Sequence, residues 1–402
     1  MQLRMLSSRR PSGVAALAGV AALVLVTACT STGSSSASAS TPAAASATAS
    51  ATAAQATRAT TPVTVYVGEL HAVVPIRTAT STVLPPIRVH GASGIVFTPD
   101  GKTAYVLISP PLGPGTVIPI RTGTNAALAP VTVGRDPQAI AITPDGSAIY
   151  VANSGSNTVT PIRTTTDTVL PPIRVGSGPG AIAITPDGQT AYVANIGSNT
   201  VSPIRTVTNT ALAPIRVGNS GLLPGSVLIT PDGSTAYVLN RGSGTVTPIR
   251  TATNTALAPI KVPGFPMSMA VTPDGTTVYV VAPGSPYQEG TVVPIRTATD
   301  TDLSPIRVGA FPAGIAITPD GKTAYVTNQL SGTVTPIRTA TDTALAPIQV
   351  GGNPGVIAIA PDGKTAYVTN NGTVVPILTA TNQVLRPIKV VPDVLEFMAI
   401  TP

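Results

Sequence analysis

The stretch Ala181–Gly218, AIAITPDGQTAYVANIGSNTVSPIRTVTNTALAPIRVG, is the clearest copy of a unit that recurs eight times between Pro62 and Pro402. The link between its first two apolar runs is Thr-Pro-Asp-Gly, which suits a tight hairpin because Pro presets φ and Gly accepts a positive φ. A tandem unit of about 42 residues indicates a closed repeat architecture. The unit offers four runs of strand length, at Ala181–Thr185, Thr190–Ala194, Thr200–Thr206 and Ala211–Val217.

Four short antiparallel strands per unit, repeated radially, predict an all-β fold of the β-propeller type. The fourth run contains Ala-Pro-Ile-Arg-Val, and Pro with a long cation favours an exposed outer edge. Seven first runs precede a Pro-Asp-Gly turn, and the missing eighth is Phe397–Pro402 at the end of the chain. We therefore predict eight four-stranded blades, the last closed by pairing of this C-terminal strand with the N-terminal strands in Val63–Val89. The second-run tyrosine gives the same count, at Tyr66, Tyr105, Tyr150, Tyr192, Tyr237, Tyr279, Tyr325 and Tyr367.

The second run also carries a family resemblance. Its sequence is Tyr-Val-Thr-Asn at Tyr325–Asn328 and again at Tyr367–Asn370. With this motif the chain resembles the YVTN-repeat β-propeller family of surface-layer-like proteins. The resemblance covers about 340 residues, implies the fold and carries no information about activity. The family's usual Val-Ile-Asp in the third run is Pro-Ile-Arg here, so no role of that Asp is transferred.

The N-terminal segment has the pattern of an export signal. Basic residues up to Arg10 precede the uncharged stretch Val14–Val26 and the tetrad Val-Thr-Ala-Cys, which resembles the bacterial lipobox. We predict a signal peptide over 1–28, lipidation of Cys29, a disordered Ser/Thr/Ala tether over 29–61 and a propeller over 62–402. The expected location is the outer face of the cell membrane. An ordinary secretory signal is the alternative, and Sec and Tat export both stay open.

Composition excludes several classes of function. The 10% of charged residues and the net charge of +7 provide no concentrated basic face, and the chain has no Trp, so we expect no nucleic-acid partner. Cys29 is the single cysteine, which excludes an intrachain disulfide. The turn aspartates could form a ring of metal ligands, but each stands alone on its own blade, and we assign them to turn geometry.

Length variation between units predicts a binding face. The Pro-Asp-Gly turns are 45, 42, 45, 42, 46 and 42 residues apart, and the extra residues fall in Ser109–Gly115, Asn219–Ser226 and Pro283–Gly290. In an up-and-down blade these links emerge on one face, where variable loops on a rigid scaffold usually bind. Neutral drift of surface loops is the alternative. The candidate binding residues on this face are Arg135, Leu222, Leu223, Phe265, Tyr287, Glu289 and Phe311.

Candidate catalytic groups are few. His71 and His90 are the only histidines, and they fall on the same predicted face with Glu69 nearby, as a candidate for an acid–base or metal cluster. Lactonases that resemble this family in fold place His, Glu and Arg at the channel mouth. Haem d-type propellers also have eight blades, but they need axial His and several Arg, and the chain has no C-x-x-C-H motif. We expect no cofactor and no metal.

The repeated arginines at the ends of the third and fourth runs would form basic bands around the outer wall. Such bands could attract anionic wall polymers or lipid headgroups, while edge protection and solubility explain them more simply. The sequence thus predicts a monomeric, non-enzymatic, lipid-anchored scaffold that binds a protein or a cell-envelope polymer. A lactonase-like hydrolase is the alternative.

Overall fold

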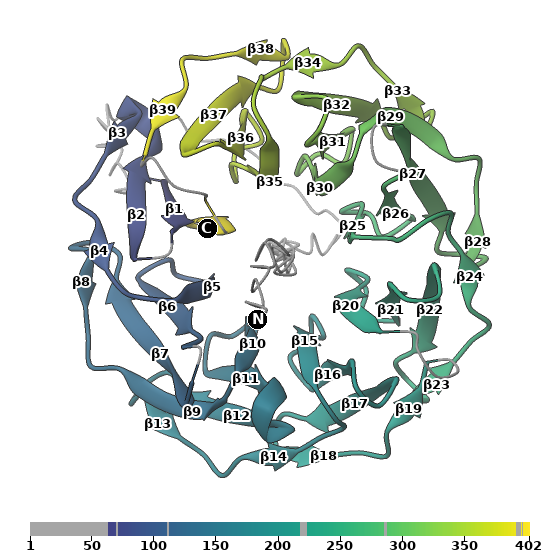
Figure 1. Ribbon diagram of the computed structural model, residues 1–402. Helices are drawn as coiled ribbons and strands as arrows, with labels where there is room; N and C mark the ends of the chain where they lie inside the picture. The colour runs from purple at the N-terminus through teal and green to yellow at the C-terminus, as the bar shows by residue number, and fades with distance from the viewer. Residues whose placement is uncertain are drawn as a thin grey trace, which may run out of the picture.

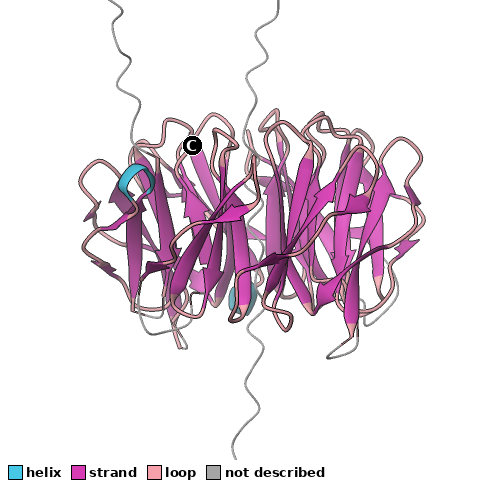
Figure 2. Ribbon diagram, turned by 90° about the horizontal axis from the view of Figure 1, so that it is seen from above, coloured by secondary structure: helices cyan, strands magenta, loops and turns pink. Residues whose placement is uncertain are grey.

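The computed structural model describes residues 63–69, 71–110, 112–217, 223–284, 288–390, 395 and 397–402. These residues form eight antiparallel sheets arranged as blades around a central axis (Figure 1). Seen from the side, the blades make a disc whose links emerge at its two faces (Figure 2). The predicted all-β, eight-bladed β-propeller is confirmed. No helix in the described ranges has the length and apolar character needed to cross a membrane.

Each blade is named here by its innermost strand. The innermost strands are β5 (Ala92–Phe97), β10 (Pro137–Ile142), β15 (Pro179–Ile184), β20 (Pro224–Ile229), β25 (Ser268–Val271), β30 (Pro312–Ile317), β35 (Pro354–Ile359) and β40 (Phe397–Ile400). In the same blade order, the second strands are β6 (Thr103–Ile108), β11 (Ala148–Asn153), β16 (Thr190–Asn195), β21 (Thr235–Asn240), β26 (Thr277–Ala282), β31 (Thr323–Asn328), β36 (Thr365–Asn370) and β1 (Thr64–Gly68).

The third strand of each blade ends in Arg, except in the β35 blade. These strands are β7 (Pro114–Arg121), β12 (Thr158–Arg163), β17 (Thr200–Arg205), β22 (Thr245–Arg250), β27 (Glu289–Arg296), β32 (Thr333–Arg338), β37 (Thr373–Leu378) and β2 (Ala72–Arg77). Two single-turn 3-10 helices, η1 (Thr78–Thr80) and η2 (Ser154–Ser156), lie in the links.

The outermost strand is split into two short pieces, which corrects the single fourth run expected from the sequence. Both pieces pair with the third strand, and the interruption falls at Leu-Ala-Pro or its equivalent. The pieces are β8 (Ala126–Ala127) with β9 (Val131–Arg135), β13 (Thr168–Val169) with β14 (Ile173–Arg174), β18 (Thr210–Ala211) with β19 (Ile215–Arg216), β23 (Thr255–Ala256) with β24 (Ile260–Lys261), β28 (Thr301–Asp302) with β29 (Ile306–Ala310), β33 (Thr343–Ala344) with β34 (Ile348–Gln349), β38 (Gln383–Val384) with β39 (Ile388–Lys389), and β3 (Thr82–Val83) with β4 (Ile87–Arg88).

This interruption explains the proline within each third strand. The carbonyl of Pro203 accepts a hydrogen bond of 2.8 Å from the N–H of Leu212, so Pro203 turns its polar groups toward the outermost strand. Since the N–H and C=O of one strand residue point to the same side, the donor that Pro203 lacks would face the break between β18 and β19. The proline therefore costs the sheet no ladder bond with the second strand.

The ring closes through the chain's two ends, as predicted. β40 pairs antiparallel with β1, with Val65 opposite Ile400 and Gly68 opposite Phe397. The β40 blade therefore combines strands from the beginning and the end of the described chain (Figure 1).

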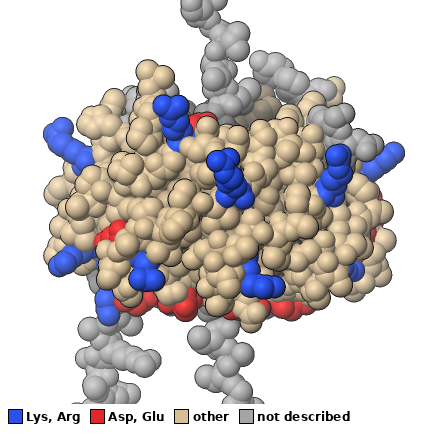
Figure 3. All heavy atoms as spheres, turned by 90° about the horizontal axis from the view of Figure 1, so that it is seen from below, with Lys and Arg blue, Asp and Glu red and all other residues tan. Residues whose placement is uncertain are grey.

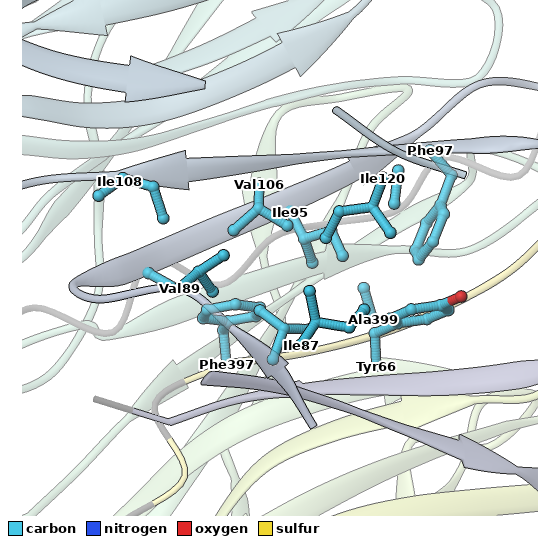
Figure 4. Packing of buried hydrophobic residues seen from close by; sticks show 13 residues of the cluster. Tyr66, Ile87, Val89, Ile95, Phe97, Val106, Ile108, Ile120, Phe397 and Ala399 are labelled. Carbon is cyan, nitrogen blue, oxygen red and sulfur yellow. The ribbon is translucent and has the colours of Figure 1, made fainter. Parts of the chain in front are cut away.

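The hydrophobic core is divided among the interfaces between neighbouring blades. One cluster joins Tyr66, Ile87 and Phe397 of the β40 blade to Ile95 and Phe97 of the β5 blade (Figure 4), and the rings of Tyr66 and Phe97 are 5.4 Å apart. Seven further clusters join the other neighbouring blades in the same way. Each blade is thus stabilised mainly by burial against its two neighbours.

The repeated tyrosine makes the same polar contact at seven of these interfaces. Its hydroxyl donates to an Asn or Asp of the following blade, and this acceptor has a positive φ, which Asn and Asp tolerate. The acceptor lies in the link between the third and fourth strands. The pairs are Tyr66–Asn125, Tyr105–Asp167, Tyr150–Asn209, Tyr192–Asn254, Tyr237–Asp300, Tyr279–Asp342 and Tyr325–Asn382.

Candidate binding face

The disc has two chemically different faces. The loop face carries the links between second and third strands and the links from one blade to the next. The turn face carries the Pro-Asp-Gly turns and the links between third and fourth strands. β1 runs from the turn face to the loop face, so Val63 enters the ring on the turn face, and β40 also ends there at Pro402. The start of the described chain therefore lies opposite the loop face.

Acidic groups concentrate on the turn face. Seven turn aspartates lie there, and Figure 3 shows Asp and Glu gathered at one face while Lys and Arg are spread around the outer wall. In a representative turn, Asp100 accepts hydrogen bonds from the Thr98 hydroxyl at 2.6 Å and from the Lys102 N–H at 3.0 Å. These bonds, led by that from Thr98, lower the pKa of Asp100. They support the interpretation of these aspartates as turn residues.

Exposed apolar side chains favour the loop face. Of the seven large exposed apolar residues in the described chain, four lie on the loop face, whereas Val207 lies on the turn face and Val169 and Leu385 on the outer wall. The four residues of the loop face are Leu112, Leu223, Phe265 and Leu330, with Leu112 89% and Phe265 69% exposed. These residues lie in links of different blades, and they make the loop face the more apolar of the two faces.

All three predicted loops are partly strand, which corrects their expected bounds. The second ends with Pro224–Ser226 of β20, and the other two end in third strands. Pro114 and Gly115 belong to β7, and Glu289 and Gly290 belong to β27, so the extra residues lengthen the outer hairpin. Each glycine permits close contact with the next blade, since a Cβ on Gly115 would lie 2.3 Å from Cγ of Pro137. The β5 and β25 blades that carry these extensions stand across the ring from each other (Figure 1).

The candidate binding residues are spread around the loop face. Arg135 is exposed at the end of β9, where it is paired opposite Pro114. Glu289 begins β27 and forms an exposed ion pair of 3.6 Å with Arg307. Phe265 lies in the link between β24 and β25. Leu222, Tyr287 and Cys29 lie outside the described residues.

Leu223 and Phe311 adopt an unusual backbone conformation. Their φ values are +49° and +53°, and Gly91, Asp136 and Gly178 have positive φ at the equivalent position. In all five cases the carbonyl accepts a hydrogen bond from the residue that follows the second strand. A bulky side chain with positive φ is strained by about 1–2 kcal/mol. Other units place Gly or Asp at this position, and these residues tolerate a positive φ. A strained residue that persists where a tolerant one would fit is an indication of function.

Arg241 was missed by the sequence analysis. It follows β21 at a position that is Ser109, Ser154 and Ile196 in three other units. Its Nη2 donates to the carbonyl of Met267 at 3.2 Å, and its Nε is buried without a hydrogen-bond partner. Burial lowers the pKa of this guanidinium. The sequence does distinguish Arg241, because it is charged whereas Ser109, Ser154 and Ile196 at the same position are not.

The candidate histidines lie together, as their predicted placement on one face allowed. The rings of His71 and His90 are 5.3 Å apart in an edge-to-face arrangement, and both side chains are exposed. Glu69 lies in the same link as His71, and its N–H donates to the carbonyl of Ala72. His71 precedes the third strand and His90 follows the fourth, so the pair occupies the outer half of the blade rather than the channel mouth. Among the described residues, no group of three or more His, Cys, Asp or Glu could hold a metal ion.

Two open grooves, of about 340 and 400 Å³, lie between blades on the turn face. Thr235 and Arg250 line the first, and the equivalent Thr323 and Arg338 line the second. Both grooves are thus features of the repeat, and neither includes a candidate binding residue.

Comparison with known proteins adds to the description of the fold. No protein-family model and no curated protein matches the chain. Among solved structures, Kuenenia stuttgartiensis hydrazine synthase matches 75% of this chain and 96% of its own at 24% identity and a TM-score of 0.57. Dihydro-heme d1 dehydrogenase NirN, in complex with DHE, matches 84% of this chain and 74% of its own at 15% identity and a TM-score of 0.70.

A protein of unknown function from Desulfotomaculum acetoxidans DSM 771 matches 71% of this chain and 95% of its own, at 18% identity and a TM-score of 0.53. At such identities these similarities show the propeller fold alone.

Proposed function

We propose that this protein is a lipid-anchored, cell-surface β-propeller of the YVTN-repeat type that acts as a non-enzymatic binding scaffold. The observation that carries the proposal is the opposition of the two faces. The chain enters the ring at Val63 on the acidic turn face, while Leu112, Leu223 and Phe265 are exposed on the loop face. A tether from Cys29 would therefore join the propeller on the face opposite the loop face and leave the loop face free to bind.

The anchoring part of the proposal is tested with Cys29→Ala. In the native host, the wild-type chain should partition into detergent with the membrane fraction and be accessible to antibody on intact cells. The variant should be recovered without lipid, because the thiol that would carry it is gone. Equal membrane partition of both chains would contradict the proposal.

The binding part is tested by substitutions on the two faces. Leu112→Ser and Phe265→Ser together should abolish recovery of partners that co-purify with the wild-type chain, because the two side chains provide exposed apolar contact area. Val207→Ser is the matched control, since Val207 is 83% exposed on the turn face. Loss of the same partners in the control would show that binding does not depend on the loop face.

A hydrolase is the second candidate, favoured by the contact between the only two histidines of the chain. Two adjacent imidazoles can exchange protons with a bound substrate. A turnover screen on lactone and ester substrates tests this reaction class. Activity that disappears in His71→Ala would favour the enzyme over the scaffold.

A further inference from the structure

We propose that Arg241, which is bonded to the backbone of Leu223 and of Met267, forms a site at the mouth of the central channel for a carboxylate of a protein partner. The inference rests on the proposed scaffold function and names the chemistry of the partner. It is carried by the position of Arg241, by its unpaired charge and by its apolar neighbours.

Arg241 is held at the channel mouth by contacts with two blades. Its N–H donates to the carbonyl of Leu223 at 3.2 Å, and its Nη2 reaches the carbonyl of Met267 in the link that leads into β25. The side chain lies across Gly225 of β20, where a Cβ would come within 2.9 Å of Nε. Since β20 and β25 are innermost strands, the guanidinium lies beside the channel rather than on the outer wall.

The charge of Arg241 has no carboxylate partner among the described residues. The ion pairs in these ranges involve other cations, and Glu289 on the same face is paired with Arg307. Nε is enclosed without a hydrogen-bond partner, so the charge is partly removed from water, and this burial lowers the pKa of the guanidinium. An unpaired, partly desolvated cation is unfavourable, and a carboxylate that binds its outer Nη groups would relieve that cost.

The surroundings favour a peptide over a polyanion. Leu223, whose carbonyl Arg241 contacts, is 47% exposed, and Phe265, two residues before Met267, is 69% exposed, so apolar surface is available close to the chain segments that hold Arg241. A wall polymer with repeated phosphates would instead match a row of cations, and such rows run around the outer wall. The strained conformation of Leu223 also places an apolar side chain where equivalent blades have Gly91 or Gly178.

The test is selection of random heptapeptides displayed on phage, with the full-length chain immobilised in detergent. Peptides that bind should share Asp, Glu or a free C-terminal carboxylate next to Leu, Ile or Phe. Resynthesised peptides are then measured by fluorescence polarisation. Arg241→Gln should raise Kd about tenfold or more, as expected for loss of a central charged contact, and Arg241→Lys should raise it less.

A second variant changes the position of the guanidinium and keeps its charge. Gly225→Ala should displace Arg241 and weaken peptide binding. Gly355→Ala is the matched control, because the equivalent glycine has only Thr369 within 4 Å of an added Cβ. Gly355→Ala should leave Kd unchanged, and thermal unfolding of every variant shows whether it is folded.

Selected peptides without an acidic group, an unchanged Kd in Arg241→Gln, or no peptide retained by the wild-type chain would each overturn the proposal. Binding of poly(glycerol phosphate) that is tighter than peptide binding and survives Arg241→Gln would also overturn it, in favour of the outer arginines. These outcomes are separate from membrane release in Cys29→Ala, so the inference can fail while the proposed surface scaffold stands.

Discussion

Thr64 and Thr401, which are 337 residues apart, exchange two hydrogen bonds that join the ends of the propeller. The N–H of Thr64 donates to Oγ1 of Thr401 at 2.9 Å, and the N–H of Thr401 donates to the carbonyl of Thr64 at 3.0 Å. The bonds continue the pairing of β1 with β40 and fix the register in which Phe397 and Ile400 are buried.

Deletion of residues 397–402 should therefore prevent cooperative folding. It removes four buried side chains of β40, of which each large one contributes about 1.5–3 kcal/mol, and it leaves the second strand of that blade as an open edge. Deletion of Pro402 alone is the control, because this residue is exposed and should cost little. Thermal unfolding followed by circular dichroism compares the two. A sharp transition at the wild-type temperature in the longer deletion would contradict the closure.

The repeated tyrosines should make the fold sensitive to alkali. Desolvation raises the pKa of Tyr66, Tyr150 and Tyr192 from 10.0 to about 12. Since the folded state favours the neutral phenol, its stabilisation is complete below pH 10 and is lost as pH rises toward 12. Tyrosinate absorbance and circular dichroism should change together in that interval. Reversible ionisation near pH 10 with an unchanged dichroism spectrum would show that the phenols are not protected.

Leu223→Gly should leave stability unchanged or raise it by up to about 1 kcal/mol, because glycine accepts the φ of +49° without strain. Leu330→Gly is the matched control, since Leu330 is 49% exposed and is not among the described residues with positive φ. Added backbone freedom should destabilise that variant by about 0.5–1 kcal/mol. Denaturant unfolding measures both. A clear loss of stability in Leu223→Gly would show that packing of this side chain outweighs the strain.

Asp300→Asn should reveal a modest electrostatic contribution at one interface. Oδ2 of Asp300 is 2.7 Å from Nη2 of Arg250, while Oδ1 accepts from the Tyr237 hydroxyl. The amide keeps an acceptor for Tyr237 and loses the ion pair, so we expect a loss of at most about 1 kcal/mol, smaller at high salt. Asp167→Asn, at the same position in another blade, is the control. The measurement is the melting temperature of each variant at low and at high salt. An equal loss and an equal salt dependence in the two variants would refute the expectation.

Most of the fold could be predicted because its determinants are local. The turn at Pro186-Asp187-Gly188, the alternation in Ala181–Ile184 and the recurrence of Tyr192 each depend on a few neighbouring residues, and their repetition predicts both blade number and the closing strand. The split of the outermost strand was missed, since the effect of Pro214 depends on the partner strand that it faces. The lengthening of β7 and β27 was also missed, since it depends on pairing of the added residues with β9 and β29.

The candidate site was less predictable. The sequence placed His71 and His90 on one face, but their ring contact depends on the path of two links through space. Arg241 attracted no attention because its importance comes from burial against Gly225 and Met267. Cys29, Leu222 and Tyr287 stay predictions, as they lie outside the described residues.

The sequence by itself determined an eight-bladed ring and the partition of its links between two faces, because turn chemistry and strand alternation act over a few residues and the repeat multiplies them. The tertiary structure decided which side chains meet between blades. Tyr150 finds Asn209 in the next blade, and Arg241 reaches the carbonyl of Met267. Such contacts join segments tens of residues apart, so they exist only after hydrophobic burial has brought neighbouring blades together.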